Sequence, residues 1–245
     1  MACNALCCCF SGEPLSQDEV EKGRGSRYAK YVNYVNKFQI SMGDAPCKEC
    51  PCCLVACCPL SFICVQHHMR YKVLNHVAPG SGWDNYLCCQ GYIPPCCCFA
   101  PGSCCEKELP RTCACCEIVC CPGLVVSSTR FVMMDHYELT ADEGDNRLIR
   151  FNNCMQLLSC ICHILALFNR DFQQLAALID LIADIVFFTT AGCMTAQVNY
   201  EIKYRDALGG AHGGVSAGPP PYHAPPPTVV AVPAGAPPDN EAMAR

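Results

Sequence analysis

The chain has 245 residues, of which 27 are cysteine, and its formal net charge at pH 7 is −5. Charged residues make up 16% of the sequence, a low share for a soluble domain, and no basic stretch is large enough to predict nucleic-acid binding. An odd number of cysteines excludes complete disulfide pairing within the chain. Residues 1–12 lack the basic and long apolar regions of a secretory signal, so we expect reduced thiols in a cytosol-facing protein.

Residues 1–27 are predicted to form an N-terminal tail that carries lipid. Four cysteines lie close together beside Leu6 and Phe10, and a basic stretch over residues 22–37 follows. Stable membrane anchoring needs two signals, for example two acyl chains or one chain and a basic patch. We therefore favour S-acylation over an inert thiol cluster at Cys3, Cys7, Cys8 and Cys9.

Residues 28–205 are predicted to form a mainly α-helical, cysteine-rich domain associated with a membrane. In residues 28–40, tyrosines beside lysines suit a membrane interface, and an ordinary surface helix or strand is the alternative. Proline and glycine interrupt the cysteine-rich segments 47–65 and 88–126, so we expect short helices there. Neither segment contains the run of about 20 apolar residues that a spanning helix requires.

The pattern C-x-C-C-x-x-x-C-C-P occurs twice, over residues 50–59 and 113–122. If both copies are helical, each places three cysteines on one face, and the two stripes could face each other. Three interpretations are open for them: compact helix packing, S-acylation, or a closed tetrahedral site for zinc or a softer cation. The six cysteines are Cys50, Cys53, Cys57, Cys113, Cys116 and Cys120.

Both copies contain C-C-x4-C-P, which resembles the C-C-x4-C-P-C signature of the placenta-specific and plant cadmium-resistance family of cysteine-rich membrane proteins. The order of Arg130, Tyr137 and Cys154 is similar to that family's downstream stretch. Leu60 and Gly123 stand where the signature has its final cysteine. The resemblance implies a membrane-associated protein without enzyme activity, linked to divalent-metal handling or growth control.

The longest apolar stretches, residues 154–168 and 175–198, are separated by a polar turn and predict a helical hairpin in or on a bilayer. The second stretch is long enough to span a membrane, but it contains Asp180 and Asp184, which share one helical face. A carboxylate at mid-membrane costs at least about 2.5 kcal/mol on insertion scales. The pair therefore indicates either an amphipathic helix whose aspartates face water or an ion pathway.

Residues 206–245 are rich in glycine, alanine and proline, and they are predicted to be a disordered tail. The tail contains P-P-x-Y at Pro219, Pro220 and Tyr222, a sequence type that docks in the aromatic groove of WW domains. A spacer with a chance tyrosine is the alternative.

No phosphate-binding loop, nucleophile elbow or H-E-x-x-H motif occurs in the sequence, so we predict no enzyme activity. The leading hypothesis is a membrane-associated protein that binds or helps to transport divalent metal ions, with zinc as the cofactor to test. Its partners would be membrane lipids, WW-domain proteins and further copies of the chain, and both of its ends would face the cytosol. The alternative is a soluble structural protein, packed by cysteine or zinc, that recruits partners through its proline-rich tail.

Overall fold

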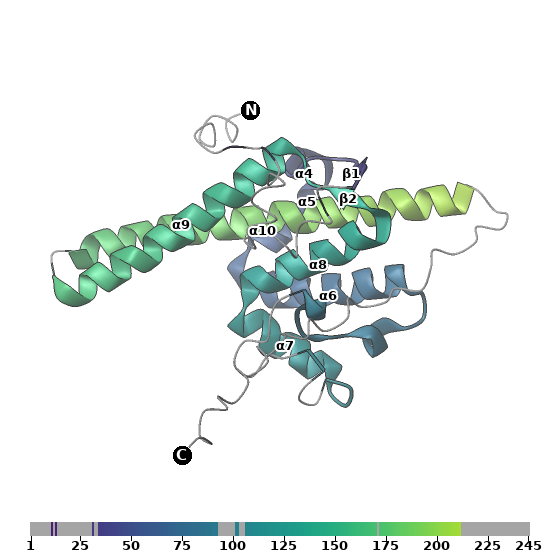
Figure 1. Ribbon diagram of the computed structural model, residues 1–245, viewed down its shortest axis with the longest axis horizontal. Coiled ribbons are helices and arrows are strands. Elements are labelled where there is room, and N and C mark those ends of the chain that lie inside the picture. Colours follow the sequence, from purple (N-terminus) through teal and green to yellow (C-terminus); the bar gives the residue numbers. More distant parts are fainter. Residues whose placement is uncertain are drawn as a thin grey trace, which may run out of the picture.

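The computed structural model describes residues 11, 13, 31, 34–92, 101–102, 106–170 and 172–211. Most of these residues are helical (Figure 1), which confirms the prediction of a mainly α protein with short cysteine-rich helices and a C-terminal hairpin. The elements are β1 (Asn36–Lys37), α4 (Ala45–Lys48), α5 (Cys50–Cys57), α6 (Pro59–Val77), η1 (Gly82–Asn85), η2 (Cys88–Gly91), α7 (Pro110–Cys120), α8 (Pro122–Tyr137), β2 (Leu139–Thr140), α9 (Glu143–Phe168) and α10 (Phe172–Ala211).

Prolines begin several of the cysteine-rich helices. Pro59, Pro110 and Pro122 are the first residues of α6, α7 and α8. Proline is favoured at this position because its φ is already helical and because the N–H that it lacks would have no partner within the helix. The chain changes direction at these points, and α5 and α6 are bent by 119° relative to each other.

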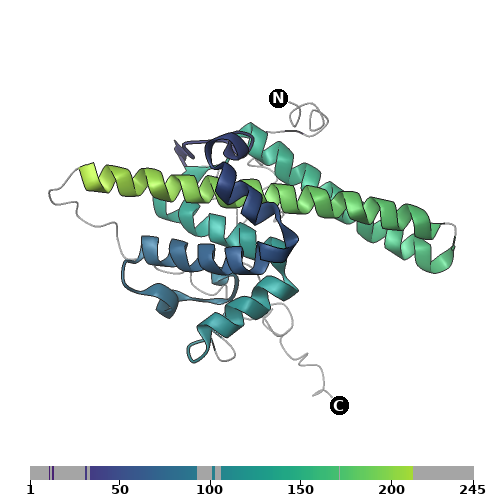
Figure 2. The same ribbon diagram turned by 180° about the vertical axis from the view of Figure 1, so that it is seen from behind.

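Helix α10 runs through the whole molecule. Its second half is buried against α4, α5, α6 and α8, and its first half lies beside α9 and projects away from them (Figures 1 and 2). We call the projecting part, residues 153–168 and 172–187, the arm, and the rest of the described chain the head. The predicted hairpin is therefore present, and both of its helices are longer than expected.

The extra length of the two helices has local causes. Helix α9 begins at Glu143 because the carboxylate of Asp142 accepts a hydrogen bond from the backbone N–H of Asp145, at 2.8 Å, and so caps the helix. Helix α10 continues beyond the apolar run because Val198 and Ile202 pack among the buried side chains of α6 and α8. It ends at Ala211, past the boundary at residue 206 that the composition predicted.

A buried polar network ties α8, α9 and α10 together at the centre of the head. The guanidinium of Arg130 contacts the carboxylate of Asp145 and donates to the side-chain oxygen of Gln197 at 3.0 Å. The backbone N–H of Met42 donates to the other Asp145 oxygen at 2.8 Å. Because the charges of this ion pair are matched and hydrogen-bonded, the pair is tolerated in the interior and fixes how the three helices meet.

Candidate membrane hairpin and buried cysteine cluster

The arm is apolar on its outside. Helices α9 and α10 are both long and apolar enough to cross a membrane, and only 11% and 22% of their most apolar 18-residue stretches are buried. The bent pair of α5 and α6 would count as a third span if it acted as one. The arm exposes twelve large apolar side chains, those of Leu157, Leu158, Ile161, Ile164, Leu165, Leu167, Phe168, Leu175, Leu178, Leu181, Ile182 and Ile185.

Polar side chains of the arm are gathered between its two helices. The amide of Gln156 donates to the carbonyl of Ala183 at 2.9 Å, and the hydroxyl of Ser159 donates to the carboxylate of Asp180 at 2.8 Å. Asp180 is thus half-buried against α9, whereas Asp184, one turn further along, is exposed. The interpretation of this pair as an ion pathway stays a prediction.

Three phenylalanines lie where the arm leaves the head. Phe187 and Phe188 of α10 contact Phe62 of α6, with ring centroids 5.9 and 5.4 Å apart. A Cβ placed on Gly123, near the start of α8, would lie 3.5 Å from the Phe187 ring. The first turns of α6 and α8 therefore both contact α10 at Phe187.

A second cluster lies inside the head, between η2 and α7. The thiols of Cys88 and Cys89 and a carboxylate oxygen of Glu117 lie within 4.8 Å of one another, and all three residues are buried. The backbone of Cys89, within η2, is left-handed, with a φ of 46°. The cysteine doublet was visible in the sequence, but its approach to Glu117 depends on how α7 packs, so sequence analysis did not find the cluster.

Glu117 already has two strong partners. Arg70 donates to one of its oxygens at 3.0 Å, and the hydroxyl of Tyr86 donates to the other at 2.7 Å. Burial and the nearby carboxylate raise the pKa of Tyr86. The hydrogen bond with Cys88 is the main cause that raises the pKa of the Cys89 thiol, and burial is the second cause. These groups are therefore a satisfied polar set without a metal, and a cation would have to replace thiol protons.

The two predicted cysteine stripes contact different parts of the head. Cys53 and Cys57 of α5 lie against Gly192 of α10, where a Cβ would come within 2.2 Å of the Cys57 sulfur. A hydrogen bond between Cys53 and Cys193 is the main cause that raises the pKa of Cys53 to about 12. Helix α10, and not the second stripe, thus covers Cys53 and Cys57 of the first stripe.

The other cysteines of the two stripes are more exposed. Cys113 packs against the cluster around Leu74 and Trp83, whereas Cys50, Cys116 and Cys120 are exposed. Within the described residues, the six stripe cysteines form no set of three ligand atoms of the kind seen at Cys88, Cys89 and Glu117. Metal binding by the six cysteines stays a prediction.

Several predicted sites lie outside the described residues. They are the lipidation cluster at Cys3, Cys7, Cys8 and Cys9 and the tail motif at Pro219, Pro220 and Tyr222. Near the first of them, the guanidinium of Arg150 donates to the backbone carbonyls of Ser11 and Glu13. Because Arg150 lies on α9 just before the arm, residue 11 lies beside the base of the arm.

The fold and these sites define a helical, cysteine-rich protein with an apolar hairpin arm attached to a packed head. No family model, curated protein or solved structure that was compared with this chain matches it. The resemblance to the placenta-specific and plant cadmium-resistance family stays an expectation.

Proposed function

We propose that the protein is anchored in a membrane by its arm, and that the head lies at one surface as a cytosolic, cysteine-rich platform. The observation that carries this proposal is the apolar exterior of the arm, which leaves twelve large apolar side chains without protein contacts that bury them. Exposed apolar surface of this extent is costly in water and is typical of membrane-facing segments.

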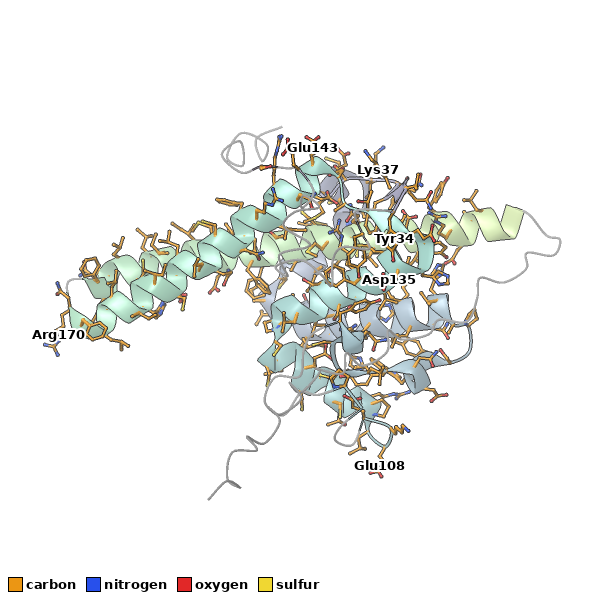
Figure 3. The ribbon with its side chains drawn as sticks, in the orientation of Figure 1. Tyr34, Lys37, Glu108, Asp135, Glu143 and Arg170 are labelled. Atoms are coloured by element: carbon orange, nitrogen blue, oxygen red, sulfur yellow. The ribbon has the colours of Figure 1, made fainter. Side chains whose placement is uncertain are left out.

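The length of the arm supports insertion. Each of its helical segments has 16 residues and therefore extends about 24 Å, close to the roughly 30 Å thickness of a bilayer's hydrocarbon core. Arg170 lies at the tip of the arm (Figure 3), where its long side chain could reach the far headgroups. The head and both ends of the hairpin then lie on the same side of the membrane.

The two aspartates are compatible with this arrangement. Counted along α10 from Phe187, Asp184 lies about 5 Å and Asp180 about 10 Å into the arm. Asp184 is thus close enough to the surface for its carboxylate to reach water, and Asp180 is hydrogen-bonded to Ser159 between the helices. Acidic residues within membrane helices are tolerated when they are paired or near an interface.

The thiols of the head support its proposed cytosolic orientation. The free thiols of the described chain include buried ones at Cys53, Cys88 and Cys193 and an exposed one at Cys64. Such a set persists in a reducing compartment, and in an oxidising one it would be open to disulfide exchange. S-acylation of the N-terminal cysteines belongs to the same proposal, because lipid attachment requires thiols at the cytosolic surface.

Membrane extraction tests the anchoring. We expect the chain to stay with membranes after alkaline washing and after hydroxylamine has removed thioester-linked lipid. Replacing Leu178→Asp and Leu181→Asp should release much of it, because each aspartate in the arm costs about 3 kcal/mol on insertion scales. The matched control is Leu109→Asp with Leu208→Asp, two exposed leucines of the head. A chain that is soluble before and after hydroxylamine would instead support the soluble structural protein.

Binding of a soft divalent cation by the head is a second candidate function. The observation in its favour is the convergence of Cys88, Cys89 and Glu117, because two thiolates and a carboxylate are a donor set that zinc accepts. Arg70 and Tyr86 oppose it, since a cation would have to share Glu117 with them. This site differs from the six cysteines that the sequence singled out.

Metal analysis of the purified, reduced chain tests this candidate. A bound cation should approach one equivalent in the parent and be lost when Cys88 and Cys89 are both replaced by serine. The control is Cys115→Ser with Cys116→Ser, an adjacent pair on α7 that lies outside the cluster. Equal metal content in parent and both variants would rule the cluster out as the site, and loss in the control alone would favour the predicted stripes.

A further inference from the structure

The two copies of the cysteine–proline pattern form equivalent structures in the head. In each copy a short helix ends at the first cysteine of a doublet, the second cysteine caps it, and a longer helix begins at the following proline, so that α5 leads into α6 and α7 into α8. We call these turns the two junctions. Figure 2 shows both at the end of the head from which the arm projects.

Contacts with α10 place the junctions at the base of the arm. Phe62, three residues after Pro59, contacts Phe187 and Phe188, and Gly123, directly after Pro122, lies against the Phe187 ring. The arm leaves the head at these phenylalanines. If the arm is inserted, both junctions must therefore lie close to the membrane surface.

The junctions present apolar side chains outward. Leu60 is 95% exposed, and Leu54 and Val119 are 66% and 62% exposed. Together with Val55, Ile63 and Leu124, which are also exposed, these residues make up what we call the junction surface. A nearly fully exposed leucine that follows a helix-starting proline is not explained by packing within the head.

The junction surface also lacks charge. Residues 50–69 contain no Asp, Glu, Lys or Arg, and residues 112–129 contain only Glu117, which is buried and bonded to Arg70. An uncharged apolar surface of this kind has no groups that could pair with the charges of a partner. Transferring it from water to lipid carries little desolvation cost.

The backbone at the junctions is suited to a medium poor in water. The hydroxyl of Ser61 donates to the carbonyl of Val55 at 2.6 Å, which satisfies an acceptor at the end of α5. The hydroxyl of Ser127 also donates, at 2.9 Å, to the carbonyl of Gly123, which lies within the first turn of α8. Proline at the start of α6 and α8 removes one unpaired N–H from each helix. Polar backbone groups are thus partly satisfied where lipid would contact them.

We infer that the junction surface rests on the boundary between headgroups and acyl chains of the same membrane that holds the arm. This inference depends on the proposed anchoring and adds the orientation of the head to it. Lipid is the occupant because the surface continues from the base of an apolar arm and bears no charge. Both junctions lie at the base of the arm, so they would hold α6 and α8 with their first turns at the membrane and their ends away from it.

Tryptophan placed on this surface tests the inference in the full-length chain, reconstituted in phosphatidylcholine vesicles. Trp83 is the only tryptophan of the parent, and it is buried, so it provides a background to subtract. Leu60→Trp reports on the junction surface, Leu178→Trp on the arm, and Glu108→Trp on a part of the head away from the arm (Figure 3). All three original side chains are exposed, so the substitutions disturb no core packing.

Bromine on lipid acyl chains quenches tryptophan emission by contact. We expect vesicles brominated at shallow acyl carbons to reduce the emission of a tryptophan at position 60 relative to unbrominated vesicles. The emission of a tryptophan at position 108 should be the same in both kinds of vesicle. Vesicles brominated deep in the acyl chains should quench position 178. Position 60 behaving like position 108 while position 178 is quenched overturns the inference and leaves the anchoring intact.

The remaining outcomes are also decisive. An unquenched tryptophan at position 178 overturns the anchoring and, with it, the inference that depends on it. In a third outcome, the tryptophan at position 60 stays unquenched while the chain crosslinks to a second copy through this surface. That result would assign the surface to self-association and overturn lipid as its occupant. Val119→Trp repeats the measurement at the second junction and must agree with Leu60→Trp if both junctions touch the membrane.

Discussion

Gly192 is the residue on which the closest helix contact of the head depends. With no side chain, it lets the backbone of α5 approach α10, and the Cys57 sulfur occupies the place that a Cβ would take. The backbone oxygen of Cys53 and the backbone nitrogen of Cys57 would each lie 3.1 Å from such a Cβ. Cysteine here acts as a small apolar side chain in a tight interface, which is the packing interpretation of the first stripe.

Replacing Gly192 with alanine should destabilise the head. Overpacking of this kind costs about 1 to 3 kcal/mol, and a gain of up to about 1 kcal/mol in helix propensity offsets only part of it. The control is Gly209→Ala in the same helix, where the added Cβ has no neighbour within 4 Å and should be neutral or stabilising. Thermal unfolding in detergent measures both, and a Gly192→Ala chain as stable as the parent would contradict the close approach.

His136 makes the head sensitive to pH. Burial is the main cause that lowers its pKa below the usual value, and His76 and Arg205 nearby act in the same direction. Its Nε2 atom is buried without a hydrogen-bond partner. The histidine therefore takes up a proton less readily in the folded head than in the unfolded chain.

The free energy of unfolding should accordingly fall as the pH is lowered from about 7.5 to about 5.5, because the unfolded chain binds protons near pH 6.5 and the folded head resists them. His136→Phe should lose less stability over this interval than the parent, whereas His68→Gln, a change at an exposed histidine, should lose as much as the parent. Chemical unfolding at several pH values measures this. Equal losses in parent and His136→Phe would show that His136 has no part in the pH dependence.

Among the elements, the arm is held together by few polar contacts. Its two helices meet through small or polar residues such as Ser159, Cys162, Ala176 and Ala183, which are buried while the larger apolar side chains face outward. This reverses the usual arrangement of a soluble hairpin, in which the large apolar side chains are inside. Close packing of small residues and hydrogen bonds between helices are the forces that remain available in lipid.

Ser159 and Asp180 should therefore be energetically coupled. Ser159→Ala removes the donor to the Asp180 carboxylate, and a double-mutant cycle with Asp180→Asn should give a coupling of about 0.6 to 1.7 kcal/mol in detergent micelles. The same cycle between Ser159 and Asp184 should give a value near zero, since Asp184 is exposed. Equal coupling to both aspartates would mean that the hydrogen bond does not stabilise the arm.

At the scale of the whole molecule, Ser11 and Glu13 lie close to the base of the arm. Arg150 binds the carbonyls of Ser11 and Glu13 at the base of α9, so the predicted lipidation cluster is attached only a few residues from the place where the arm begins. Acyl chains on those cysteines would enter the same membrane as the arm. They would add to an anchor that does not depend on them.

Replacing Cys3, Cys7, Cys8 and Cys9 with serine should remove most of the acyl-exchange signal and leave the chain in the membrane fraction. The reason is that the arm alone buries far more apolar surface than one or two acyl chains. Mass tagging after hydroxylamine treatment measures the first effect, and fractionation measures the second. The control is the same fourfold replacement at Cys47, Cys50, Cys154 and Cys160, which are exposed cysteines elsewhere. An undiminished signal in the N-terminal variant would move lipidation to other cysteines.

The sequence by itself indicated a helical domain, breaks at the prolines and a C-terminal hairpin, but it did not determine how far α6, α9 and α10 extend. Pro59 and Pro122 begin helices for a reason that lies within the chain's own backbone, and the two apolar runs after residue 153 are visible without a partner. The polar turn between them then requires a hairpin. Local features such as these do not depend on which other helix packs against the segment. The residues adjacent in the sequence are therefore sufficient to predict them.

Tertiary structure alone decided what each cysteine face contacts. The periodicity of α5 indicates that Cys53 and Cys57 share a face, but only packing could choose α10 and Gly192 to cover it. In the same way, the meeting of Cys88, Cys89 and Glu117 joins residues nearly thirty positions apart through the docking of α7. Cysteines are small and chemically alike, so their spacing predicts only which of them share a helix face. The shape of the surrounding helices decides whether that face is buried and what covers it.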